Sequence, residues 1–274
     1  MNIKGKIVGF AHRYEEPVGY ELLIGEEQIY LNEWIGQDIT IQHTGQITCV
    51  HCGRKIKKTY NNGSCYPCFT TRPDNDLCIV KPHECHFEKG TCRDEDFAHT
   101  HCMIPHYVYL AISSGVKVGI TRKNNEKKRW VDQGAVRAFP IAEVPTRKMA
   151  GEIEIILSQH IGDKTNWRKM LKSDIDWVDL KELRENLMEK IPSSFQSYLL
   201  REEEWTDISY PYGDPLEKIT AYNLDKQPII EDRLIGIKGS YLLFSKGVLN
   251  IRKYAGYEAV INVNTPCQTN RESL

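Results

Sequence analysis

The sequence YVYLAISSGVKVGITRKNNEKKRWVDQGAVRAFPIAEVPTRKMAGEIE, residues 107–154, decides the fold of the central part of the chain. Apolar side chains alternate with others over residues 107–112 and again over residues 116–121, which is the period of a strand with one buried face. Ser113-Ser114-Gly115 separates the two runs and predicts a tight turn. We therefore expect a hairpin whose second face, with its phenols, lysine and glycine, forms the floor of a site.

Helical spacing replaces this alternation after Thr146. The apolar residues that follow the helical period are Met149, Ile153, Ile156, Leu157 and Ile161. This pattern predicts an amphipathic helix, with Glu152 and Glu154 on the flanks of its apolar stripe.

The order of tyrosine, glycine, arginine and glutamate resembles the GIY-YIG nuclease superfamily, particularly the phage-type branch whose second half-motif reads KIGIT where this chain reads KVGIT. By this resemblance the motif tyrosine falls on Tyr109 and the motif glycine on Gly119. The helix arginine falls on Arg129 and the metal-binding glutamate on Glu154. Members of the superfamily often carry an asparagine twelve residues after that glutamate, where this chain has Asn166.

The chain as a whole resembles a second group. Its cysteines precede the segments KVGITR and RWVDQGA, as in a prokaryotic family of uncharacterised cysteine-rich proteins. That resemblance implies no particular activity.

The nuclease resemblance implies hydrolysis of nucleic-acid phosphodiesters with a magnesium or manganese ion. Glu154 would hold the ion, with Glu152 as the alternative ligand. Tyr109 would deprotonate or orient the attacking water, with Tyr107 as a second phenol on the same strand face. Arg129 would clamp the phosphate with two parallel hydrogen bonds, which lysine cannot imitate.

Two further positions follow from the same resemblance. Asn166 would position backbone or substrate groups. Lys117 departs from the motif, because it replaces the first tyrosine of the second half-motif two residues before Gly119. A lysine holds a phosphate well but is a poor general base unless burial lowers its pKa, so Lys117 favours binding over catalysis.

The cysteines give the strongest local signal. Cys49-x2-Cys52 and Cys65-x2-Cys68 form two pairs, and each x2 spacing lets two sulfurs from one turn face one ion. Four thiolates satisfy the tetrahedral preference of zinc, which predicts a structural zinc-ribbon-like site. An iron–sulfur cluster, a redox pair and unligated thiols are the alternatives.

A second set of cysteines has wider and less regular gaps. It comprises Cys78, Cys85, Cys92 and Cys102, interleaved with His83, His86, His99 and His101. Four more thiols in a short segment predict a second zinc, against the alternative of ordinary thiols and histidines. The ninth cysteine, Cys267, is expected to be a free thiol.

Composition sets the class of protein. With 41% hydrophobic and 27% charged residues, the 274-residue chain is ordinary for a globular protein of one sizeable core or several small domains. Its net charge of −1 provides no general attraction to nucleic acid, so binding would depend on local basic patches near residues 54–58 and 122–129.

The N-terminus lacks a secretory apolar core and no apolar run could span a membrane, so we expect a cytoplasmic protein. Oligomeric state is left open.

The chain is expected to fold in four parts, giving an α+β protein. Residues 1–47 would form a β module, residues 48–103 a zinc-binding region, and residues 104–210 a GIY-YIG-like mixed sheet with flanking helices. The acidic run at residues 202–204 and the prolines and glycine at 211–215 indicate a linker. Residues 211–274 would then form a second small β module.

Three functions are compatible with this sequence. The first is a metal-dependent nuclease with structural zinc. The second is a nucleic-acid-binding protein without catalysis, and the third is a zinc-stapled scaffold for protein interactions. Metal-dependent turnover separates the first two, and salt-sensitive affinity for nucleic acid separates both from the third.

Overall fold

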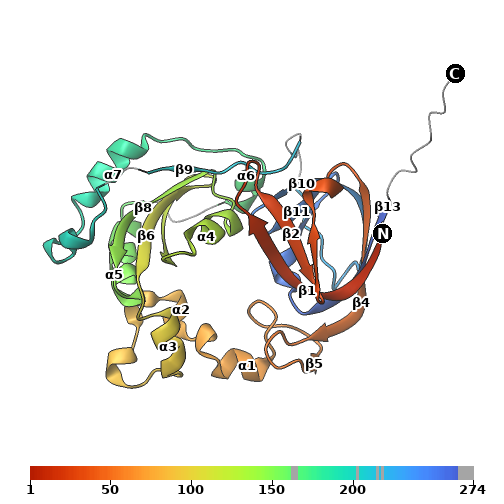
Figure 1. The fold of residues 1–274 in the computed structure, drawn as a ribbon, viewed down its shortest axis with the longest axis horizontal. Coiled ribbons are helices and arrows are strands. Elements are labelled where there is room, and N and C mark those ends of the chain that lie inside the picture. Colours follow the sequence, from red (N-terminus) through yellow and green to blue (C-terminus); the bar gives the residue numbers. More distant parts are fainter. Residues whose placement is uncertain (162–165, 202–203, 214–215, 217–218, 265–274) are drawn as a thin grey trace. The chain divides into compact units, whose positions relative to one another are not determined.

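The computed structural model describes residues 1–161, 166–201, 204–213, 216 and 219–264 (Figure 1). Glu202, Glu203, Pro215 and Cys267 lie outside these ranges. The chain divides into two compact units. The central unit contains residues 66–209, and the β unit contains residues 1–65 together with residues 210–274. The protein is therefore a mixed α+β protein, as the sequence predicts.

The sheet of the central unit has the strand order β7-β6-β8-β9. Its strands are β6 (His106–Ile112), β7 (Val116–Arg122), β8 (Arg137–Val144) and β9 (Thr206–Asp207). All three neighbouring pairs are antiparallel, so the expectation of a mixed sheet is wrong. The reason is that β7 and β8 lie on opposite sides of β6 and both run antiparallel to it. In the hairpin Tyr109 lies opposite Gly119.

One face of this sheet is the expected apolar face. Helix α5 (Arg147–Ser158) covers it and contacts β6, β7 and β8. Thr146 caps this helix, because its side chain accepts a hydrogen bond from the backbone N–H of Met149. The fully buried apolar side chains between helix and sheet include Val108, Leu110, Ile112, Ala150, Ile153 and Leu157. Burial of each aliphatic side chain larger than alanine contributes roughly 1.5–3 kcal/mol.

The second face of the hairpin is not the open floor that the sequence predicts. Helix α4 (Glu126–Asp132) lies over it, and its Trp130 meets the ring of Tyr109 edge to face at a centroid distance of 5.9 Å. Tyr109 has no exposed surface. The two residues form a small core with Ala111, Ala135 and Ala138. The alternation of the strand is real, but both of its faces are buried here.

In the described part of the central unit, three further helical segments follow α5. They are α6 (Trp167–Leu171), α7 (Leu180–Met188) and the 3-10 helix η5 (Ser193–Tyr198). Asn166 caps α6, and its backbone N–H donates to the Ser114 hydroxyl in the hairpin turn. Asp179 caps α7. Among the described helices, none is long and apolar enough to cross a membrane.

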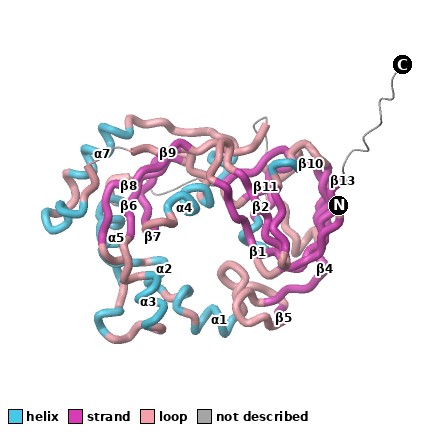
Figure 2. Tube along the Cα trace, in the orientation of Figure 1, coloured by secondary structure: helices cyan, strands magenta, loops and turns pink. Residues whose placement is uncertain are grey.

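Residues 66–103 form short helices joined by loops (Figure 2). The helices are α1 (Tyr66–Thr71), η2 (Pro73–Asn75), α2 (Leu77–Val80), η3 (Pro82–Glu84), η4 (Phe87–Lys89) and α3 (Glu95–His101). Within this stretch, α1 and α2 contain no buried residue. These two helices therefore add no buried residue to an apolar core.

The β unit is a single curled antiparallel sheet. Its strand order is β12-β11-β10-β4-β13-β1-β2-β3, with β5 paired to β4. The strands are β1 (Asn2–Arg13), β2 (Gly19–Ile24), β3 (Glu27–Tyr30), β4 (Asp38–Thr48), β5 (Lys55–Ile56), β10 (Ile229–Lys238), β11 (Tyr241–Phe244), β12 (Val248–Asn250) and β13 (Tyr257–Asn264). The register of β1 shifts between Ile7 and Gly9, and such a bulge increases the local twist of a sheet.

The two β modules expected at the ends of the chain are therefore one sheet. Strand β13 pairs with β1 on one side and with β4 on the other, so strands from both ends of the chain interleave in the middle of the sheet. The physical reason is that each terminal segment has strands with one apolar face but too few of them to bury that face alone. The alternation of side chains identifies the strands without identifying their partners.

Candidate functional site

The first candidate site is the cysteine cluster. The sulfur atoms of Cys49, Cys52, Cys65 and Cys68 all lie within 4.8 Å of one another. Cys49 directly follows β4, and Cys68 lies in α1. The Cys52 and Cys65 sulfurs are 3.7 Å apart, and four sulfurs at about 2.3 Å from a tetrahedral zinc would be about 3.8 Å apart. The four cysteines that the sequence predicts as one set do come together, and they could bind a zinc ion.

Backbone hydrogen bonds prepare one of these thiols for metal. Burial alone would raise the pKa of Cys49, but backbone N–H groups of Cys52, Cys65 and His51 favour the thiolate and lower its pKa to about 6. The N–H of Cys65 donates to the Cys49 sulfur at 3.2 Å. Thiolate is the form that binds zinc, so both the donor chemistry and the spacing of the cluster fit this metal.

The second set of cysteines is arranged differently. The ligand atoms of Cys78 and His86 lie within 4.8 Å of each other and of a carboxylate oxygen of Asp76. Asp76 is absent from the sequence prediction because nothing in its spacing separates it from other acidic residues. Among the described residues, Cys85, Cys92 and Cys102 are not part of this close group.

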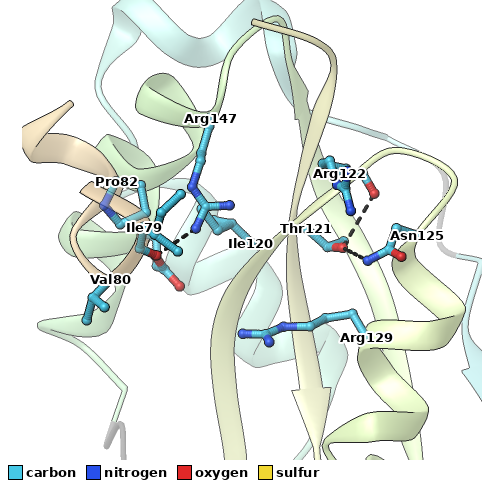
Figure 3. Close-up of a pocket in the computed structure, with 10 residues that line it drawn as sticks. Ile79, Val80, Pro82, Ile120, Thr121, Arg122, Asn125, Arg129 and Arg147 are labelled. Carbon is cyan, nitrogen blue, oxygen red and sulfur yellow. Dashed lines mark hydrogen bonds between the residues drawn. The ribbon is translucent and has the colours of Figure 1, made fainter. Parts of the chain in front are cut away.

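The third candidate is a pocket in the central unit with a volume of about 280 Å³. It lies where the end of β7, the helices α4 and α5, and the segment after Cys78 meet (Figure 3). Its walls are formed by Ile79, Val80, Pro82, Ile120, Thr121, Arg122, Asn125, Arg129, Arg147 and Glu154. Three arginines and one carboxylate therefore line a single pocket, whose charge favours an anion.

Arg129 and Arg147 reach this pocket from different elements. Figure 3 shows their guanidinium groups extending toward the same space, Arg129 from α4 and Arg147 from the start of α5. One Nη of Arg147 donates to the carbonyl oxygen of Ile79 at 2.8 Å. The Nε atoms of both arginines are buried and have no hydrogen-bond partner in the part of the chain that the structure describes. Such donors are available to an anionic ligand.

Tyr109 interacts with Arg129 but does not line the pocket. Its hydroxyl donates to Oε1 of Gln133 at 2.9 Å and interacts with the side chain of Arg129. Burial raises the pKa of Tyr109 above its usual value, although Arg129 acts in the opposite direction. Glu154 is also close enough to influence this phenol. Tyr109, Arg129 and Glu154 therefore lie near one another, but the buried phenol is not placed to act as a base.

Gly119 makes this arrangement possible. A Cβ at position 119 would lie 2.6 Å from the hydroxyl oxygen of Tyr109 and 2.7 Å from its Cζ. Real Cβ atoms essentially never approach other atoms so closely. The glycine is therefore required by the packing of the tyrosine across the hairpin.

Four other predicted residues lie away from the pocket walls. Tyr107 lies beside Glu143, which together with burial raises its pKa, and Lys123 lies over its ring at 5.9 Å. Lys117 pairs with Ala111, nearer the turn than Gly119. Asn166 lines a separate pocket beside Ser114 at the turn end of the hairpin, so the structure does not bring it together with Glu154. Glu152, the alternative metal ligand, is not among the residues that line the pocket.

The sequence prediction misses Arg147. A usable signal exists, because Arg147 and Glu154 are seven residues apart, which is two helical turns and places them on one face. Arg122 appears in the sequence only as part of a basic patch, and its position at the end of β7 selects it from that patch. The contribution of Ile79 and Pro82 to the pocket depends on tertiary contacts alone.

Comparison with known proteins adds a family. No curated protein and no solved structure matches the chain. Residues 36–259 match the family described as protein of unknown function, DUF2797. This range includes the cysteine cluster, the pocket and most of both units. The chain therefore belongs to the DUF2797 family of proteins of unknown function.

Proposed function

We propose that the protein binds nucleic acid in the arginine-lined pocket and hydrolyses a phosphodiester there, with a divalent cation held by Glu154. The observation that carries this proposal is that Arg122, Arg129 and Arg147 line the same pocket of about 280 Å³ as the Glu154 carboxylate. Arginine is the side chain best suited to bind phosphate oxygens in pairs. A volume of this size admits a phosphate group and part of an attached sugar.

The arginines would bind the scissile phosphate and stabilise the charge that develops on it. Arg129 is held by the buried Tyr109, and Arg147 by its bond to the Ile79 carbonyl, so their positions are set before a ligand arrives. Preorganised donors of this kind stabilise a transition state without reorganising during the reaction. Tyr109 is then a positioning residue for Arg129.

Glu154 is the ligand that this proposal assigns to the metal. It comes from the middle of α5 and is half-buried at the pocket wall. Magnesium or manganese accepts a single protein carboxylate because it keeps most of its waters. When bound, such an ion would supply an acidified water and a counter-charge for the phosphate.

A non-enzymatic role in nucleic-acid binding is the second candidate. The observation that favours it is the placement of the residues at the two tyrosine positions of the motif, Tyr109 and Lys117. Tyr109 is fully buried with a raised pKa, and Lys117 does not line the pocket. In this case the arginines would bind a phosphate without cleaving it, and the zinc cluster would stabilise the fold.

The test compares Glu154→Gln with the matched control Glu152→Gln. Both carboxylates lie on α5 and both are half-buried, but only Glu154 lines the pocket. The measurement is cleavage of labelled single-stranded and double-stranded DNA and RNA with magnesium or manganese, together with affinity at two salt concentrations. Glu154→Gln should abolish cleavage and leave affinity within about threefold, whereas Glu152→Gln should behave as wild type.

Each outcome selects one function. Equal cleavage by wild type and Glu154→Gln would reject Glu154 as the metal ligand. Salt-sensitive binding without cleavage by wild type would leave the binding role. Absence of binding to any polymer at low salt would reject both and favour an interaction scaffold.

A further inference from the structure

The group formed by Asp76, Cys78 and His86 has features of a metal centre. The ring nitrogen Nδ1 of His86 lies 2.9 Å from the hydroxyl oxygen of Thr91. The other nitrogen, Nε2, points toward Asp76, whose carboxylate oxygen is 3.6 Å away. A metal-ligating histidine commonly uses its second nitrogen in a hydrogen bond that fixes the ring orientation. His86 is oriented in this way, with Nε2 facing the group.

Additional thiols lie around this group. The thiols of Cys85, Cys92 and Cys102 lie close enough to Cys78 to interact with it electrostatically. Asp76 is already paired with Arg93, whose Nε is 2.7 Å from a carboxylate oxygen. Because Arg93 already neutralises the Asp76 carboxylate, the Cys78 sulfur and the His86 imidazole remain as metal ligands. This combination of ligands is typical of zinc rather than of magnesium or calcium.

The segment between the two ligands forms one wall of the pocket. Ile79, Val80 and Pro82 lie between Cys78 and His86, and all three line it. Val80 is 80% exposed and α2 contains no buried residue, so Pro82 is the one buried residue among residues 78–86.

Two contacts join the segment to α5. Arg147 donates to the Ile79 carbonyl, and Gly151 lies so close to Pro82 that a Cβ there would be 2.5 Å from the proline Cβ. A crosslink at both ends of residues 78–86 would fix the part that contacts α5.

From these observations we propose that residues 76–102 bind a second zinc ion through Cys78 and His86. Thiolates from among Cys85, Cys92 and Cys102 complete the four ligands. The ion holds in place the pocket wall formed by Ile79, Val80 and Pro82. The ion is structural, because four protein ligands leave no open position. The segment between its ligands Cys78 and His86 lines the pocket, so the ion stabilises the pocket wall. This inference does not rest on the proposed hydrolysis.

The zinc content of the full-length chain, measured by elemental analysis after purification without chelator, tests the site. Wild type should contain about two zinc ions per chain, and Cys78→Ser and His86→Ala about one. The Cys52→Ser variant should lose the ion bound by the first cysteine cluster. The double variant Cys52→Ser/Cys78→Ser should lose both ions. His83→Ala is the matched control, because His83 lies between the two ligands but outside the group, and it should keep two.

Thr91→Val provides a version of the test that keeps every ligand. It removes the hydroxyl beside Nδ1 of His86 and should increase the rate of zinc release from one of the two sites by about tenfold or more in a competing chelator. Two sites with unchanged release rates would argue against His86 as a ligand.

Hydrogen exchange tests the wall. Amides of residues 77–86 should exchange faster in His86→Ala than in wild type and at the wild-type rate in His83→Ala. One zinc per wild-type chain, lost entirely in Cys52→Ser, would overturn the second site. If His86→Ala loses one zinc ion but the amides of residues 77–86 do not exchange faster, the second zinc ion does not hold the pocket wall.

Discussion

Replacement of Gly119 by alanine tests the geometry on which the pocket depends. The new Cβ would lie 2.6 Å from the hydroxyl oxygen and 2.7 Å from Cζ of Tyr109. Tyr109 cannot move aside easily, because it is fully buried and contacts Trp130. We therefore expect the clash to move the ring and break its hydrogen bond to Gln133.

The magnitude follows from these contacts. Overpacking costs about 1–3 kcal/mol, and loss of the hydrogen bond adds about 1 kcal/mol. Alanine recovers about 0.4–1 kcal/mol by reducing the entropy of the unfolded chain. The net loss should be about 1–3.5 kcal/mol. Gly115→Ala is the control, because a Cβ at position 115 on the same hairpin would meet no atom within 4 Å.

Amide hydrogen exchange of β6 and β7 is the appropriate assay. A chain with two compact units need not unfold in one step, so a global denaturation curve would mix the stabilities of both. Exchange instead reports the free energy of opening of this sheet. A loss in Gly119→Ala no larger than that in Gly115→Ala would refute the packing argument. In a Tyr109→Leu background, where the clashing atoms are absent, Gly119→Ala should cost less than about 1 kcal/mol.

Three further predictions concern other parts of the chain. Cys52→Ser should release a zinc ion and make residues 49–68 the first site of limited proteolysis; an unchanged zinc content and cleavage pattern would show that this cysteine is not a ligand. His106 is buried, and burial lowers its pKa to about 4, so it stabilises the fold above its unfolded pKa of about 6.5 and loses this contribution as pH falls toward 4. The free energy of opening of the central sheet, measured by amide hydrogen exchange, should therefore drop by roughly 2 kcal/mol between pH 7 and pH 5 because of His106. The His106→Gln protein should show a smaller drop, and identical pH profiles would contradict this expectation. Arg122→Ala should weaken binding of an oligonucleotide about tenfold and lower the salt dependence by about one counterion, while Lys123→Ala, whose ammonium lies 2.8 Å from Glu143, should have less effect; equal effects would place the ligand outside the pocket.

Local features of the sequence predict local features of the structure. Alternation identifies β6 and β7, and the x2 spacing brings Cys49 and Cys52 into one cluster with the second pair. Both patterns depend on residues close together in sequence. The same is true of the cap at Thr146, whose side chain bonds a backbone group three residues on.

Long-range features were not predictable in the same way. The resemblance places Asn166 near Glu154 by counting residues, but the chain uses Asn166 to cap α6 beside Ser114. Burial of Tyr109 depends on α4 folding back over the hairpin, and alternation along one strand does not reveal that cover. The role of Arg147 at the pocket depends equally on the approach of residues 79–82.

The pairing of β1 with β13 also has a consequence for the order of events during synthesis. Residues 2–6 pair with residues 258–262, so about 250 residues must leave the ribosome before this part of β1 meets its partner. At about 5–20 residues per second this delay is roughly 12–50 s, long enough for residues 66–209 to emerge as a complete unit first. During that interval the start of β1 has an unpaired strand edge, which is a template for aggregation. The charged Lys4 and Lys6, which lie on this edge, oppose such contacts while the nascent chain waits.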